Sequence, residues 1–306
     1  MKNTGPLFAL ASALLFASGM PSAKFLLGRV DPIMLAGLLY LGSGIGLTLT
    51  LLSGERLKKR EKKRIRRGDL GWLIGSITIG GIMAPLMLLG AMTLARASAV
   101  SLLLNFEVVF TAIIAALVFK ERLSLRVIVG LLAILLGGIT LSWTTDLAAS
   151  WYLLLGLGAC LFWSLDSNLS GQIVDIEPMR IAQLKGLTSG TVNISLALLL
   201  GKHFPQPDLI ALAAVTGFLA YGISLTFFIA AMRRLGVARA MAYIATEPFI
   251  GSLLAVIFLH EPLSLNLCLA AVFMSIGVWL HLTEHHEHKH RDIQVTAENI
   301  VKTISD

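Results

Sequence analysis

Long apolar runs separated by short polar breaks dominate the chain. A helix needs about 20 apolar residues to cross the hydrocarbon core of a bilayer. The pattern therefore predicts an all-α integral membrane protein of ten transmembrane helices, with little chain outside the bilayer. The expected spans cover residues 6–27, 33–53, 70–91, 95–119, 123–143, 151–173, 179–201, 209–231, 235–259 and 263–283.

The composition supports a membrane protein. Of the 306 residues, 56% are hydrophobic and 14% are charged, and the mean hydropathy is +0.80, whereas a soluble domain devotes about a quarter of its residues to charge. The net charge of +7 does not indicate a nucleic-acid partner, because most basic residues lie between apolar runs and not along a soluble face. Lipid is the expected surrounding of most of the chain.

The chain repeats itself internally. At an offset of 146 residues, Asp31-Pro32 matches Glu177-Pro178, and at an offset of 140 residues Glu107 matches Glu247. Five spans in each copy put the second copy into the membrane from the opposite side, which gives inverted repeats. We predict two five-helix repeats and a polar, His-rich cytoplasmic tail, at residues 1–146, 147–283 and 284–306.

Lysine and arginine predict the orientation, because positively charged loops stay on the cytoplasmic side. With ten spans, the N-terminus, the tail and the segments after the second, fourth, sixth and eighth spans share one side. That side holds 20 of the 25 Lys and Arg residues, nine of them between Arg56 and Arg67. We predict a multi-pass protein of the inner (cytoplasmic) membrane with both termini cytoplasmic.

Two segments, one in each half of the chain, carry similar motifs. One is Ala-Arg-Ala-Ser-Ala-Val-Ser-Leu-Leu-Leu-Asn-Phe-Glu at 95–107, followed by Lys-Glu-Arg-Leu-Ser at 120–124. The other is Tyr-Ile-Ala-Thr-Glu-Pro-Phe at 243–249, followed by His-Glu-Pro-Leu-Ser at 260–264. These segments resemble the EamA-type transporters of the drug/metabolite transporter superfamily. The resemblance implies a central site among helices 1–4 and 6–9. It gives helices 5 and 10 a supporting or dimer-forming role, so a homodimer is left open.

Two glutamates are the main candidates for substrate binding or coupling. An ionisable group inside a span costs about 2.5–3.5 kcal/mol and therefore marks a functional candidate. Glu107 and Glu247 each lie at the centre of a predicted span, near the midplane, where inverted repeats place their site. The alternative is that each glutamate stays protonated and hydrogen-bonds to a neighbouring helix as packing.

Three further charges lie inside predicted spans. Asp166 and Lys185 occupy similar depths in consecutive spans, where they can form an ion pair. Such a pair acts either as a gate that breaks on opening or as mutual neutralisation of two costly charges. Lys24 lies near the end of the first span, from which its ammonium group can snorkel to the interface.

Other side chains complete the predicted site. Pro248 and Pro85 are expected to kink their spans, because proline frees the carbonyl one turn earlier. No metal or cofactor is expected, because Cys160 and Cys268 lack metal-binding spacing and the tail histidines define no closed site. Aromatic and amide side chains are expected to line the cavity wall: Tyr40, Trp163, Asn168, Tyr221 and Tyr243.

These features together predict a secondary transporter. The sequence contains no catalytic motif and no Walker loop, so we expect neither an enzyme nor an ATP-driven pump, and its charges are too isolated to line a channel. The predicted activity is export of a small metabolite, an amino acid or related compound, by alternating access. Multidrug or cation/polyamine efflux by the same fold is the first alternative, and a non-transporting structural or signalling membrane protein is the second.

Overall fold

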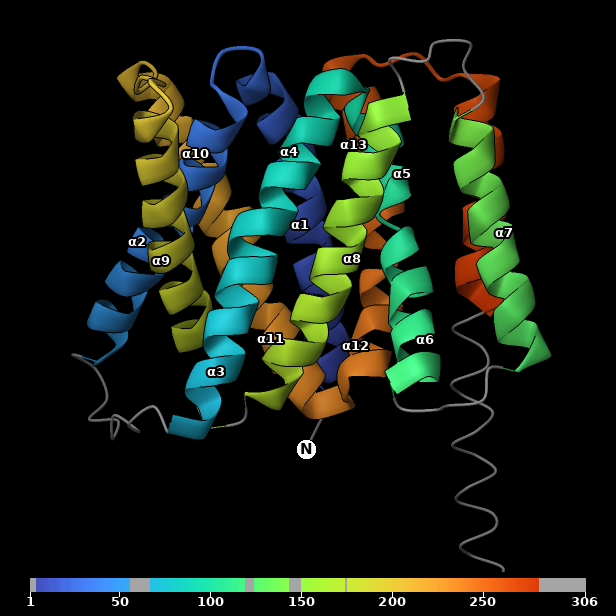
Figure 1. Ribbon diagram of the computed structural model, residues 1–306, viewed down its shortest axis with the longest axis horizontal. Coiled ribbons are helices and arrows are strands. Elements are labelled where there is room, and N and C mark those ends of the chain that lie inside the picture. The colour runs from blue at the N-terminus through green and yellow to red at the C-terminus, as the bar shows by residue number, and fades with distance from the viewer. Residues whose placement is uncertain (1–3, 56–66, 119–123, 143–149, 174, 281–306) are drawn as a thin grey trace, which may run out of the picture.

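The computed structural model describes residues 4–55, 67–118, 124–142, 150–173 and 175–280, and these residues form helices joined by turns, without a strand (Figure 1). The helical elements in the first half are α1 (Gly5–Leu27), α2 (Pro32–Glu55), α3 (Arg67–Ser76), η1 (Ile77–Met83), α4 (Ala84–Leu94), α5 (Ala97–Leu103), α6 (Phe106–Val118) and α7 (Leu125–Ser142). Those of the second half are α8 (Ser150–Gln172), α9 (Pro178–Leu199), α10 (Pro207–Thr216), η3 (Gly217–Ile223), α11 (Ser224–Leu235), α12 (Val237–Ile244), α13 (Glu247–Leu259) and the helix Leu265–Leu280.

Apolar surface covers much of the outside of the bundle. Large exposed side chains include Leu7 in α1, Leu49 in α2, Leu154 in α8 and Phe258 in α13. Within the described residues, six helices are long and apolar enough to cross a membrane, and shorter apolar helices occur at 125–141, 247–259 and 265–280. A helix that is apolar on its outer side as well as its inner side suits a lipid solvent, so this is a multi-pass membrane protein.

Two of the long helices contain a π-helical segment in their middle. α3 passes through η1 into α4, and α10 passes through η3 into α11. η3 begins 140 residues after η1, which is the offset that relates Glu107 to Glu247. π-Helical segments inside α-helices leave the regular hydrogen-bond pattern and are frequent at functional sites.

Pro85 lies inside a continuous helix, whereas Pro248 begins one. Pro85 lies in the first turn of α4, directly after η1, and Pro248 lies in the first turn of α13, after a break at residues 245–246. Proline is well tolerated in a first turn because the missing N–H has no partner there anyway. This applies to Pro248, whereas at Pro85 the π-helical segment leads straight into α4, and kinks at the two residues stay predictions.

Glycines bring the two halves of the chain into close contact. Helix α2 packs closely on α9 along Gly44 and Gly186, where a Cβ on Gly186 would lie 2.6 Å from the backbone nitrogen of Gly44. One turn away, a Cβ on Gly190 would lie 2.6 Å from the Cα of Leu41. Small residues allow such backbone approach, which strengthens van der Waals contact where no hydrophobic effect drives helices together.

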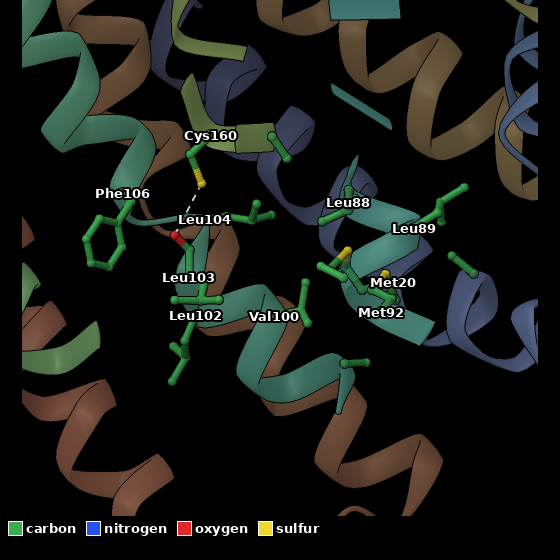
Figure 2. Close-up of a cluster of buried hydrophobic side chains, with 14 of the residues drawn as sticks. Met20, Leu88, Leu89, Met92, Val100, Leu102, Leu103, Leu104, Phe106 and Cys160 are labelled. Atoms are coloured by element: carbon green, nitrogen blue, oxygen red, sulfur yellow. Dashed lines mark hydrogen bonds between the residues drawn. The ribbon is translucent and has the colours of Figure 1, made fainter. Parts of the chain in front are cut away.

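A second contact surface is an apolar core between α1, α4, α5 and α8 (Figure 2). Leu88, Leu89 and Met92 of α4 are fully buried there. Cys160 of α8 is also buried, and its thiol donates to the Leu103 carbonyl at 3.3 Å. Cys160 is therefore a packing thiol, whereas Cys268 is exposed.

Glu261 fastens the second half to the first. Its carboxylate accepts hydrogen bonds from the backbone N–H groups of Ala97 (2.8 Å) and Ser98 (3.0 Å) at the start of α5. We expect Glu261→Ala to lower the free energy of unfolding by about 1 kcal/mol, as for other lost N-terminal caps. The stability of Glu261→Gln should lie between those of the wild type and the alanine variant, because glutamine keeps one acceptor oxygen. Thermal unfolding in detergent tests this, and an alanine variant as stable as the wild type would contradict it.

Candidate functional site

A partly open cavity lies within the bundle. Its volume is about 80 Å³, room for several water molecules or a small organic group. The cavity draws on helices of both halves and contains four of the five charged residues singled out from the sequence. Its lining consists of Ser12, Phe16, Tyr40, Glu107, Trp163, Asp166, Ser167, Lys185, Ala220, Tyr221, Ser224, Leu225, Phe228, Ile244 and Glu247.

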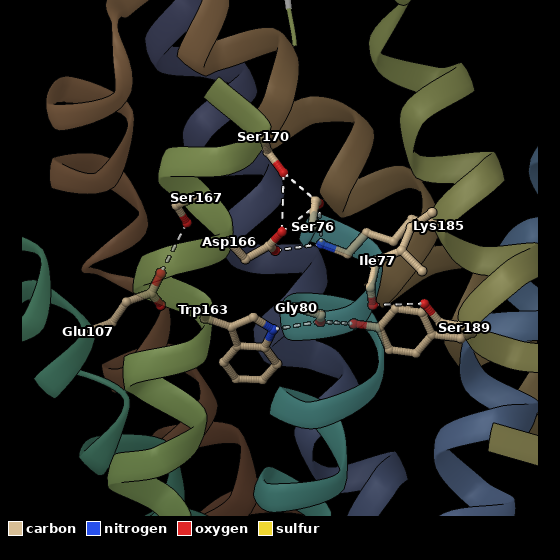
Figure 3. Close-up of polar contacts among 11 residues, drawn as sticks. Ser76, Ile77, Gly80, Glu107, Trp163, Asp166, Ser167, Ser170, Lys185 and Ser189 are labelled. Carbon is tan, nitrogen blue, oxygen red and sulfur yellow. Dashed lines mark hydrogen bonds and ion pairs between the residues drawn. The ribbon is translucent and has the colours of Figure 1, made fainter. Parts of the chain in front are cut away.

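Glu107 and Glu247 each occupy the first turn of a helix that restarts inside the bundle. Glu107 follows the break at residues 104–105 and lies in α6, and Glu247 follows the break at 245–246 and opens α13. The N-terminal turn of a helix carries partial positive charge, which stabilises a carboxylate. Ser167 donates to Glu107 Oε1 at 3.3 Å (Figure 3). The structure brings both carboxylates into one cavity.

Asp166 and Lys185 form a buried ion pair. Lys185 Nζ lies 2.5 Å from Asp166 Oδ2, with Lys185 1% and Asp166 6% exposed. Ser76 donates to Asp166 Oδ1 at 2.6 Å and accepts from Lys185 Nζ at 3.2 Å, and Ser170 also donates to Oδ1 at 3.2 Å (Figure 3). These extra bonds satisfy the pair, as a buried pair requires. Its role as a gate stays a prediction.

Four aromatic rings meet beside the cavity. The Phe16 ring centroid lies 5.6 Å from that of Trp163 and 5.3 Å from that of Tyr221, which in turn lies 5.3 Å from that of Tyr40. The Tyr40 hydroxyl (2.9 Å) and the Trp163 indole N–H (3.3 Å) both donate to the Gly80 carbonyl in η1 (Figure 3). The π-helical segment thus fixes two of the rings.

The sequence missed several polar and aromatic members of the lining. Ser12 and Ser224 join α1 to α11 by reciprocal bonds, in which each hydroxyl donates to the other residue's carbonyl, at 2.8 and 3.0 Å. Serine is common in membrane helices, so its type alone gave no signal. Phe16 could have been identified from the sequence, since it lies in the tetrapeptide Leu-Phe-Ala-Ser, which recurs as Leu-Phe-Trp-Ser 146 residues later.

Three other residues singled out from the sequence lie away from the cavity lining. The amide of Asn168 donates to the Ser164 carbonyl within α8 at 2.8 Å. Tyr243 packs against a separate apolar cluster that includes Ile229. Lys24 donates to the Met92 carbonyl and, at 2.7 Å, to the Ala95 carbonyl at the end of α4, so its ammonium group closes a helix end.

Apolar helices around buried charges define a multi-pass membrane protein with an internal polar site. The sequence profile of the EamA-like transporter family matches residues 3–143 and again residues 150–283. Because the two matches cover nearly the whole chain, the protein belongs to the EamA-like transporter family, as its motifs indicated. It is a membrane transporter.

Two relatives and a solved structure are similar to this chain over most of its length. A protein of Methanothermobacter thermautotrophicus named "uncharacterized transporter" is 25% identical over 292 residues, covering 90% of this chain and 85% of its own. One of the same name from Clostridium kluyveri is 23% identical over 290 residues, covering 89% and 91%. A chain titled only "crystal structure of protein" shares the fold with a TM-score of 0.69 at 18% identity, covering 92% of this chain and 99% of that chain.

Proposed function

We propose that the protein is a secondary transporter of the cytoplasmic membrane that exports a small metabolite by alternating access. The observation that carries this proposal is the central cavity in which Glu107 and Glu247, one from each half, face the same space. Inverted-repeat transporters place their site at the interface of the repeats, near the bilayer midplane. The proposed topology is ten crossings in two inverted five-helix repeats with both termini cytoplasmic.

The interruptions in the helices support the repeat. η1 and η3 are separated by the offset that separates the two glutamates, and both glutamates follow a helix break. The family profile also matches the two halves one after the other. Interrupted helices at corresponding positions of two halves are a pointer to a transport site. We infer that η1 and η3 bend as the cavity opens to one side and then the other.

The two glutamates supply the proposed coupling. A carboxylate in a water-poor site is neutralised either by a proton or by a cationic group. Export then proceeds when a substrate leaves one or both carboxylates and a proton takes its place, and the proton gradient drives the cycle without ATP. An amino acid or related compound meets this requirement through its ammonium group.

Proteoliposome transport tests the proposed function. With a panel of labelled amino acids and amines, we expect the wild type to transport one class in response to a pH gradient. Glu107→Gln and Glu247→Gln should bind substrate weakly and lose the response to pH, because a glutamine amide takes up no proton. Glu261→Gln is the matched control, since that residue lies outside the cavity. Unchanged affinity and pH dependence in both cavity variants would refute the coupling role.

A further inference from the structure

We propose that the cavity selects an organic cation: a small molecule that places an ammonium group between the Glu107 and Glu247 carboxylates and an apolar or aromatic body among the rings of Phe16, Tyr40, Trp163 and Tyr221. This inference rests on the proposed function, because it names the substrate class of the same site. Three observations support it: the charges of the lining, the pairing of Lys185 with Asp166, and the aromatic ring faces beside the glutamates.

With both glutamates ionised, the charge balance of the described lining is negative. Among the described residues that line it, the charged ones are Glu107, Glu247, Asp166 and Lys185, and the last two neutralise each other at 2.5 Å. Glu107 accepts a bond of 3.3 Å from Ser167, and no group in the described part of the chain donates to the Glu247 carboxylate. Buried carboxylates without a counter-charge are costly, so a positive ligand suits this space.

Among the described residues, the lining of the cavity offers no free cation to a carboxylate ligand. Lys185, the cationic side chain of the described lining, is 1% exposed, and its ammonium group already donates to Asp166 and, at 3.2 Å, to Ser76. A substrate carboxylate that took Lys185 would leave Asp166 buried without its partner, which is strongly unfavourable. An amine therefore fits this site better than an amino acid with the same side chain.

The aromatic residues offer ring surface. Tyr40 and Trp163 use their O–H and N–H on the Gly80 carbonyl, so their remaining contribution to a ligand comes from the π-systems. The four rings meet at tilted or edge-on angles of 51° to 86°. A cation within about 6 Å of an aromatic ring centre is attracted to its face, most strongly where water is excluded.

Three ligands of one skeleton test the inference on the purified wild-type protein. At pH 7, phenethylammonium is a cation, phenylalanine a zwitterion and 3-phenylpropionate an anion. Isothermal titration calorimetry and thermal unfolding in detergent should show phenethylammonium binding at least about tenfold more tightly than the other two, as expected for a charged hydrogen bond. Equal or tighter binding of phenylalanine or phenylpropionate overturns the inference, and so does an absence of phenethylammonium binding.

Variants locate the binding. Glu247→Gln should weaken phenethylammonium binding about tenfold or more, and Tyr221→Leu about 2- to 30-fold, because leucine keeps apolar bulk without the ring face. Phe258→Leu is the control for loss of a ring, since Phe258 is 67% exposed on the outside of α13. Unchanged affinity in both folded cavity variants overturns the inference. If a variant does not fold, the comparison of the three ligands on the wild-type protein still tests it.

Transport by the same ligands separates this inference from the proposed function. If phenethylammonium binds in the cavity but proteoliposomes do not move it or any other solute of the panel, the cation site stands and the transport proposal fails. If phenylalanine is transported and phenethylammonium neither binds nor moves, the transport proposal stands and the cation inference fails.

Discussion

Replacing Lys185 with methionine is expected to lower the free energy of unfolding by about 3–5 kcal/mol, the cost of breaking a buried pair by removing one partner. The loss is large because the Asp166 carboxylate, 6% exposed, keeps within the described part of the chain only its bonds from Ser76 and Ser170. Unfolding in detergent, followed by circular dichroism, measures the change. Lys202→Met is the matched control, because Lys202 pairs with Asp31 at 2.9 Å while 44% exposed and such pairs contribute at most about 1 kcal/mol.

A double variant tests whether the loss of stability comes from the unpaired Asp166 charge. The double variant Lys185→Met with Asp166→Leu should recover most of the lost stability, since an apolar pair avoids the desolvation of two ions. If the pair is also a gate, exchanging its members as Asp166→Lys with Lys185→Asp should restore part of the transport lost in either single alanine variant. A double apolar variant no more stable than Lys185→Met would contradict the account of the buried pair.

Gly217→Ala is expected to destabilise the protein by about 1–3 kcal/mol through overpacking. A Cβ on Gly217 would lie 2.7 Å from the carbonyl carbon of Leu39 and 2.8 Å from its Cα. Backbone atoms cannot turn aside as a side chain does, so α2 and η3 would have to move apart next to the cavity. The variant should therefore unfold at a lower temperature and bind cavity ligands less tightly.

Gly71→Ala is the control for this change. A Cβ on Gly71 in α3 meets nothing within 4 Å, and alanine favours a helix by about 0.5–1 kcal/mol over glycine. We expect this variant to be as stable as the wild type or slightly more so. Equal stability of the Gly217 and Gly71 variants would show that the contact between α2 and η3 adapts without cost.

The sequence identified the residues that are costly to bury in a membrane. It did not show which side of each helix faces the cavity. Glu107, Glu247 and the pairing partners Asp166 and Lys185 stood out because charge within an apolar run is expensive, and all four meet in the cavity. Asn168 was chosen only for its type and its span. Lipid and protein interior are both apolar, so the pattern of a membrane helix does not reveal which side faces the centre.

The π-helical segments were beyond prediction for a related reason. Their residues form an apolar run like any other, and two of the bonds made to η1 come from distant helices. The Gly80 carbonyl accepts bonds from Tyr40 in α2 and Trp163 in α8. No local pattern in residues 77–83 contains those partners, so the chain has to fold before the irregular backbone gains its stabilising bonds.

The glycine contacts between α2 and α9 bear on how a chain of this kind arises. Gly44, Gly186 and Gly190 hold the halves together backbone to backbone, through residues that are remote in sequence from the boundary between the halves. Covalent continuity is thus not what makes the two halves one molecule. Two unlinked polypeptides that corresponded to these halves would already possess the complementary surfaces, and joining their genes would only fix their stoichiometry at one to one.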